Sequence, residues 1–73
     1  MMTKEELKKQ ALEVLGNKPP REKFSQIREM IFLLQMKDRW NDHDFKLSDV
    51  YHEIERELKE EIKNGTNPIS KQS

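Results

Sequence analysis

Apolar residues recur at three- and four-residue spacing in three separate stretches of the chain, and such spacing is typical of α-helices with one buried face. The first stripe consists of Leu7, Ala11, Val14 and Leu15. Thr3 and Glu6 precede it in the order of a capping box, in which each side chain bonds the backbone N–H of the other residue. Gly16-Asn17 follows, and such a pair commonly ends a helix. The pattern predicts a helix over residues 4–15.

The second stripe consists of Phe24, Ile27, Ile31 and Leu34. Pro20 suits the first turn of a helix, because the N–H that proline lacks would be unpaired there. The segment WNDHDFKL, which begins at Trp40, is rich in Asn and Asp, and these residues favour turns over helix interiors. We therefore predict a second helix over residues 20–39, followed by a loop.

The third stripe is the longest and consists of Leu47, Val50, Tyr51, Ile54, Leu58 and Ile62. Ser48 is the expected N-cap, and Asp49 is favourably placed in the first turn because negative charge is stabilised there. These signals predict a third helix over residues 48–64, closed by Gly65. Residues 66–73 show no apolar period and are expected to form a flexible tail.

No segment alternates apolar and polar residues in the manner of a strand, so the predicted fold is all-α. The three helices form one small domain over residues 1–65, most simply an up-down-up bundle with the helix at 20–39 in the middle. Only 33% of the 73 residues are hydrophobic, so material for a core is scarce. Dimerisation is an alternative source of the missing core.

The second helix carries apolar side chains on a further face, opposite its first stripe. On a helical wheel, the residues of this second face are Phe32, Leu33, Met36 and Trp40. One interpretation is that the helix is buried on both sides as the middle of the bundle. The other is that this face contacts another protein, because aromatic residues and Met are enriched at interface cores. In that case Lys37 and Arg39 would set the orientation of the partner.

Trp40 has two interpretations of its own. At the end of a helix, its ring can cover the open end of the bundle while the indole nitrogen donates a hydrogen bond. The alternative is that Trp40 is a binding anchor, because Trp and Arg are common among the residues that dominate binding energy.

Charge is distributed unevenly, although the net charge is zero. Residues 1–40 contain nine Lys/Arg and six Asp/Glu, whereas residues 41–73 contain five and eight, which gives +3 against −3. This difference favours one part of the chain lying against the other, within a monomer or across an antiparallel dimer.

The residue types present give little support for a catalytic site or a metal site. The chain has no cysteine, which excludes disulfides, thiol nucleophiles and cysteine zinc sites. Asp38, Asp42, His43 and Asp44 lie close together, but counted from Asp38 or from Asp42 the glycine that a calcium loop needs at its sixth position is missing. His43 and His52 are poorly spaced for zinc. The glutamates of the third helix, which would lie among Lys and Arg on a solvated face, are Glu53, Glu55, Glu57, Glu60 and Glu61. We expect a protein that is not an enzyme and has no catalytic residue, metal, cofactor or small-molecule substrate.

A small helix-turn-helix DNA-binding protein is the alternative function. Three short helices are the scaffold of that class, and the basic residues near the start of the second helix are Lys18, Arg21, Lys23 and Arg28. The third helix would be the recognition helix, but its sequence EIERELKEE is acidic and would repel phosphate. Nucleic acid is therefore the less favoured partner.

The favoured function is that of a small regulatory or protein-interaction module whose partner is another protein or a second copy of itself. The longest apolar run, residues 30–34, is too short for a signal peptide or a membrane span, so we expect a cytoplasmic protein. The bias toward Lys, Glu, Ile and Asn is what an AT-rich genome encodes, and it suggests a bacterial or phage origin.

Overall fold

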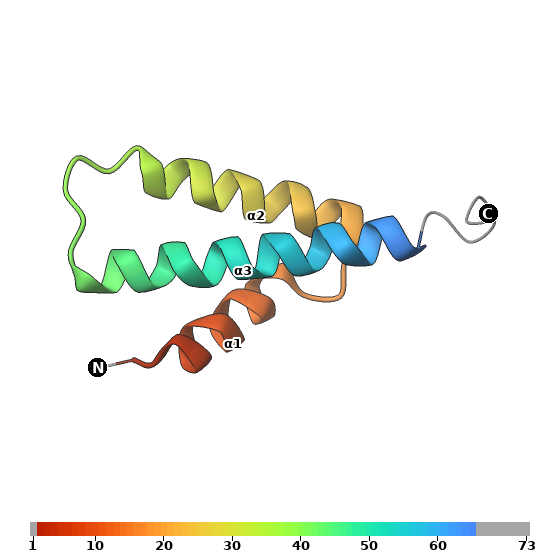
Figure 1. Ribbon diagram of the computed structural model, residues 1–73, viewed down its shortest axis with the longest axis horizontal. Coiled ribbons are helices and arrows are strands. Elements are labelled where there is room, and N and C mark those ends of the chain that lie inside the picture. Colours follow the sequence, from red (N-terminus) through yellow and green to blue (C-terminus); the bar gives the residue numbers. More distant parts are fainter. Residues whose placement is uncertain (1, 66–73) are drawn as a thin grey trace.

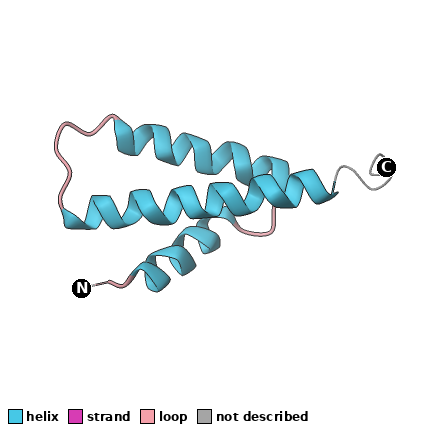
Figure 2. Ribbon diagram, in the orientation of Figure 1, coloured by secondary structure: helices cyan, strands magenta, loops and turns pink. Residues whose placement is uncertain are grey.

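The computed structural model describes residues 2–65, and the tail expected at 66–73 lies outside that range. All three elements within it are α-helices, as the sequence predicts: α1 (Lys4–Leu15), α2 (Pro20–Gln35) and α3 (Asp42–Gly65). Figure 2 shows only helices and connecting loops between residues 2 and 65. None of these helices is long and apolar enough to cross a membrane.

Helix α1 begins and ends with the residues that the sequence indicates. The Thr3 hydroxyl accepts the Glu6 N–H at 3.2 Å, and the Glu6 carboxylate accepts the Thr3 N–H at 2.9 Å, which completes the capping box. Gly16 ends the helix with φ +68°, a backbone conformation that residues with a side chain rarely adopt.

Helix α2 begins at Pro20 as predicted but ends at Gln35, four residues before the predicted end at 39. The Met36 N–H bonds to the oxygens of Phe32 and Leu33, both at 3.2 Å, and the chain then leaves the helix. In a longer helix, the Leu34 oxygen would accept the N–H four residues later. Here it accepts the Lys37 N–H at 3.2 Å and the Trp40 indole N–H at 3.0 Å, so the Trp40 side chain takes part in ending the helix.

Helix α3 begins at Asp42, and the predicted start at Ser48 is wrong. Asn41 is the cap: its side-chain oxygen accepts the Asp44 N–H at 2.9 Å, while the Asp44 carboxylate accepts the Asn41 N–H at 3.1 Å. The Asn and Asp residues therefore open the helix and do not break it, because they satisfy its unpaired N–H groups. The Ser48 hydroxyl lies 3.4 Å from the His52 ring.

The central helix is α3, and not the second helix as predicted. Figure 1 shows α2 and α3 side by side and antiparallel, with α1 crossing α3 at an angle. Most contacts of α1 are with α3, and few are with α2. Ion pairs reinforce this arrangement, because Lys4 contacts Asp49 at 3.0 Å and Lys8 contacts Glu53 at 3.1 Å across the two helices.

The core lies where the three helices meet, and it is built from the stripes that the sequence predicts. Its buried members are Leu7, Ala11, Leu15, Ile27, Ile31, Val50, Ile54 and Leu58. Val14 is the exception: it belongs to the predicted first stripe, but 59% of its surface is exposed. The four-residue repeat of Leu7, Ala11 and Leu15 faces the core, and Val14 lies to one side of it.

Candidate protein-interaction surface

Three large apolar side chains are exposed on the last turns of α2. Phe32 and Leu33 are each 59% exposed and Met36 is 64% exposed, although their neighbours Ile31 and Leu34 are buried. We call Phe32, Leu33 and Met36 the apolar patch. Met36, the C-cap of α2, follows Phe32 by four residues and Leu33 by three, and these spacings place it beside both side chains at the end of the helix. Within this monomer, the second face of the helix is therefore not covered by the core.

Trp40 belongs to the connection between α2 and α3 and not to the exposed patch. Its ring is half-buried, donates to the Leu34 oxygen and packs edge-on against Phe45, with ring centroids 5.2 Å apart and planes at 74°. These contacts match the interpretation in which Trp40 covers the end of the bundle. Phe45 is itself 57% exposed. It is not part of the predicted site, because the sequence pattern assigns residues 40–47 to a loop. Asn41 is a favourable N-cap residue, and this signal could have placed Phe45 on a helix.

Lys37 and Arg39, the two cations of the predicted site, have different surroundings. The Lys37 ammonium donates to both carboxylate oxygens of Asp44 at 3.0 and 2.9 Å, so its charge is used within the chain. Asp44 is only 3% exposed, and the hydrogen bonds from Lys37 and from the Asn41 N–H hold the pKa of its carboxyl below the ordinary value. Arg39 is exposed and forms no ion pair within residues 2–65. Of these two cations, only Arg39 has a charge that no group within residues 2–65 pairs.

A shallow groove of about 230 Å³ lies beside the apolar patch, between α2 and α3. Its lining residues are Arg28, Ile31, Phe32, Gln35, His52 and Glu55. Arg28 contacts Glu55 at 3.7 Å and lies over the Phe24 ring, 5.8 Å from its centroid. The His52 Nδ1 atom lies 2.8 Å from the Ser48 carbonyl oxygen, which can only accept, so Nδ1 carries the proton in this contact. The groove adds a polar border to one side of the patch.

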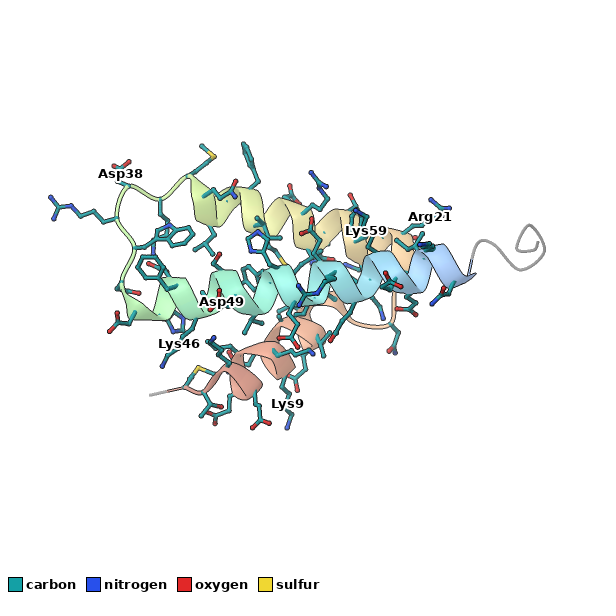
Figure 3. The ribbon with its side chains drawn as sticks, in the orientation of Figure 1. Lys9, Arg21, Asp38, Lys46, Asp49 and Lys59 are labelled. Carbon is teal, nitrogen blue, oxygen red and sulfur yellow. The ribbon has the colours of Figure 1, made fainter. Side chains whose placement is uncertain are left out.

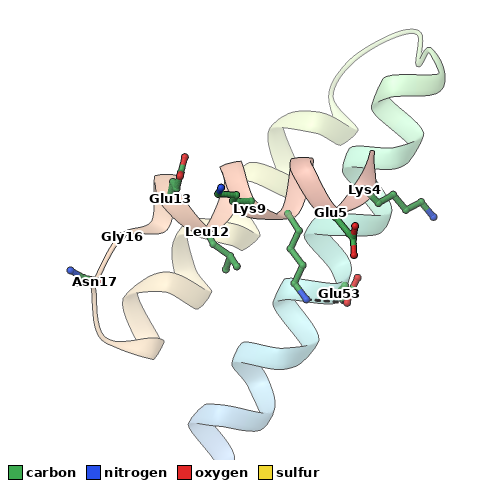
Figure 4. A pocket seen from close by; sticks show the side chains of 9 residues that line it. Lys4, Glu5, Lys9, Leu12, Glu13, Gly16, Asn17 and Glu53 are labelled. Carbon is green, nitrogen blue, oxygen red and sulfur yellow. Dashed lines mark hydrogen bonds and ion pairs between the residues drawn. The ribbon is translucent and has the colours of Figure 1, made fainter. Parts of the chain in front are cut away.

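An open depression of about 750 Å³ lies between α1 and α3 (Figure 4). Leu12 is its apolar side chain, and residues of both charge signs surround it. Lys8 donates to Glu57 at 2.9 Å and to Glu53 at 3.1 Å, and these hydrogen bonds raise the pKa of its ammonium. This depression is an open surface on which the Lys8 ammonium is paired with two glutamates.

The other chemistry-bearing side chains are dispersed. Among residues 2–65, no three His, Asp or Glu side chains converge where they could hold a metal ion. Of the basic residues near the start of α2, Lys18 bonds Gln26 and Arg28 pairs with Glu55. Arg21 lies at the end of the α2–α3 hairpin close to Lys59 (Figure 3), and both line a small pocket there.

Comparisons of the chain with protein-family models, with curated proteins and with solved structures find no match. Support for a function therefore comes from the geometry of the side chains. The apolar patch holds three of the large apolar side chains that core packing leaves exposed, and the others are Leu12, Val14 and Phe45.

Proposed function

We propose that this chain is a small, non-enzymatic interaction module of regulatory type, which acts in the cytoplasm and binds protein through the apolar patch. One observation carries the proposal: Phe32, Leu33 and Met36 are more than half exposed at the end of a helix whose other large apolar residues are buried or partly buried. Single exposed apolar residues are ordinary, but a contiguous group on successive turns is typical of an interaction surface.

The chemistry of the patch suits protein recognition. Phe supplies a large rigid surface, and Met adapts to an irregular partner surface because its side chain is unbranched and flexible. A cleft that would enclose a small molecule is missing at this place, where the neighbouring groove is shallow and has a polar border. A protein surface is therefore the better match for the patch than a substrate.

The patch is also held in a fixed position. The Trp40–Leu34 hydrogen bond and the Lys37–Asp44 ion pair fasten the connection that follows α2. Because the helix end is already ordered, a partner would bind without the entropy cost of ordering it.

The test compares two lysine substitutions of equally exposed apolar residues, one inside the apolar patch and one outside it. Leu33→Lys lies in the patch, and Val14→Lys changes a helix residue with the same exposed fraction of 59% on α1. Each variant and the native chain carry an affinity tag and are incubated with an untagged native copy and with a bacterial lysate. We expect the native chain and Val14→Lys to retain the same proteins, and Leu33→Lys to lose them. Equal retention by all three, or retention by none, would overturn the proposal.

A further inference from the structure

Charged residues border the apolar patch at both of its ends. Arg28 and Glu29 lie one turn before Phe32, and Asp38 and Arg39 follow the end of the helix. Figure 3 shows Asp38 projecting outward from the connection between α2 and α3. Within residues 2–65, Glu29, Asp38 and Arg39 form no ion pair. The patch therefore has an Arg-Glu pair at one end and an Asp-Arg pair at the other.

Glu29 lies on the outward stripe of α2 itself. Glu22, Ser25, Glu29, Phe32 and Met36 are spaced alternately by three and four residues, which is the spacing of a helix-pairing seam. The first half of this seam is polar and the second half is apolar. A second helix can therefore bury the apolar half only if it overlaps the end of α2 and does not run along its whole length.

We propose that the occupant of the patch is a second copy of this chain, with the two α2 helices antiparallel and overlapping at their ends near Leu33. This inference rests on the proposed function and names the partner. The overlap places Phe32 of each copy against Met36 of the other. A patch that meets its own copy across a two-fold axis forms a closed, isologous dimer.

The bordering charges select the antiparallel direction. In an antiparallel overlap, Glu29 of one copy comes beside Arg39 of the other, and Arg28, which also contacts Glu55 of its own chain, comes near Asp38. In a parallel overlap in register, Glu29 would meet Glu29 of the second copy, and such like-charge contacts are unfavourable. The net charge of zero adds no long-range repulsion between copies.

The size of the patch predicts a weak dimer. A large apolar side chain offers on the order of 150–200 Å² when fully exposed, so the patch exposes about 300 Å² on each copy. Stable specific interfaces bury about 1,200–2,000 Å² in total, whereas two apolar patches together offer only about 600 Å², so the contact belongs to the weak, transient class. We expect a dissociation constant on the order of 10–100 µM, and therefore a monomer–dimer equilibrium that dilution can shift.

Charge exchange at the two ends of the patch tests the arrangement. Glu29→Arg and Arg39→Glu each replace an attractive contact with a repulsive one in their own homodimers, whereas a mixture of the two variants restores opposite charges. Arg56→Glu is the matched control, because Arg56 is exposed on α3 and the substitution changes the net charge by the same amount as Arg39→Glu. Sedimentation equilibrium from micromolar to millimolar concentration measures the association of each sample, with circular dichroism to verify folding.

We expect Glu29→Arg and Arg39→Glu each to self-associate about tenfold more weakly than the native chain, and the mixture of the two variants to recover native association. The mixture of Glu29→Arg with Arg56→Glu should not recover it. Equal recovery in both mixtures would overturn the antiparallel contact, because it would show only attraction between net charges. A native chain that stays monomeric at millimolar concentration would overturn the dimer. The proposed function would still stand if Leu33→Lys then lost retained proteins that Val14→Lys kept.

Discussion

The Trp40 indole N–H donates to the Leu34 main-chain oxygen at 3.0 Å, across the turn that ends α2. Trp40→Phe keeps an aromatic ring that can pack against Phe45 but removes this donor. We expect a loss of about 1 kcal/mol in the free energy of unfolding, the usual contribution of one hydrogen bond. Urea denaturation followed by circular dichroism measures it. An unchanged midpoint would show that the indole contact does not stabilise the connection.

Because of Asp44, the free energy of unfolding of this chain depends on pH at acidic pH. Its pKa is lower in the folded chain than the ordinary value of 3.8, because Lys37 and the Asn41 N–H bond the charged carboxylate. Its stabilisation is therefore fully present above the unfolded pKa and is lost as the pH falls through the folded pKa. Melting temperatures measured from pH 6 to pH 2 should fall less steeply for Asp44→Asn than for the native chain. Identical slopes would contradict this account.

The two candidate caps of α3 give opposite expectations. Asn41→Ala removes the side-chain oxygen that accepts the Asp44 N–H, and we expect it to cost about 1 kcal/mol of stability. Ser48→Ala lies inside the helix, where the same substitution should change stability by less than about 0.5 kcal/mol. Thermal unfolding of both variants decides between the two helix starts, and a larger effect at Ser48 would contradict a start at Asp42.

Leu33 and Leu34 are adjacent, but the first is 59% exposed and the second only 8%. Leu34→Ala should lower the free energy of unfolding by roughly 2–5 kcal/mol, because it leaves a cavity beside the core. Leu33→Ala should change it by less than about 0.5 kcal/mol while weakening association. Denaturation and sedimentation on the same two proteins separate these effects. Comparable losses of stability at both positions would place Leu33 in the core.

Most of the fold follows from local signals in the sequence. The Thr3–Glu6 capping box, the Pro20 start and the apolar stripes predict three helices because each depends on residues within a few positions. The start of α3 was missed for a physical reason. Asn and Asp favour both turns and N-caps, and composition alone does not say which. The central place of α3 depends on contacts between distant segments, such as Lys8 with Glu53 and Glu57, which no local pattern reveals.

The candidate site could be predicted only as a choice between two interpretations. The wheel separates the second face of α2 from its core stripe, but it does not say whether another helix covers that face. The structure divides the predicted residues into three groups: Phe32, Leu33 and Met36 are exposed, Trp40 and Lys37 fasten the connection, and Arg39 is unpaired within residues 2–65. Trp40 is separate from the apolar patch because α2 ends at Gln35, so the chain has left the helix before it reaches Trp40.

The central claim about the partner is that the apolar patch forms a contact between two copies of this chain, and an isotope-filtered NMR experiment tests it most directly. A millimolar mixture of ¹³C-labelled and unlabelled copies reports only contacts between different molecules. We expect an intermolecular nuclear Overhauser effect between the Met36 methyl group and the Phe32 ring, with none from the buried Ile27. The absence of any intermolecular signal from Phe32, Leu33 and Met36, or signals confined to Val14 and Leu12 on α1, would contradict the claim.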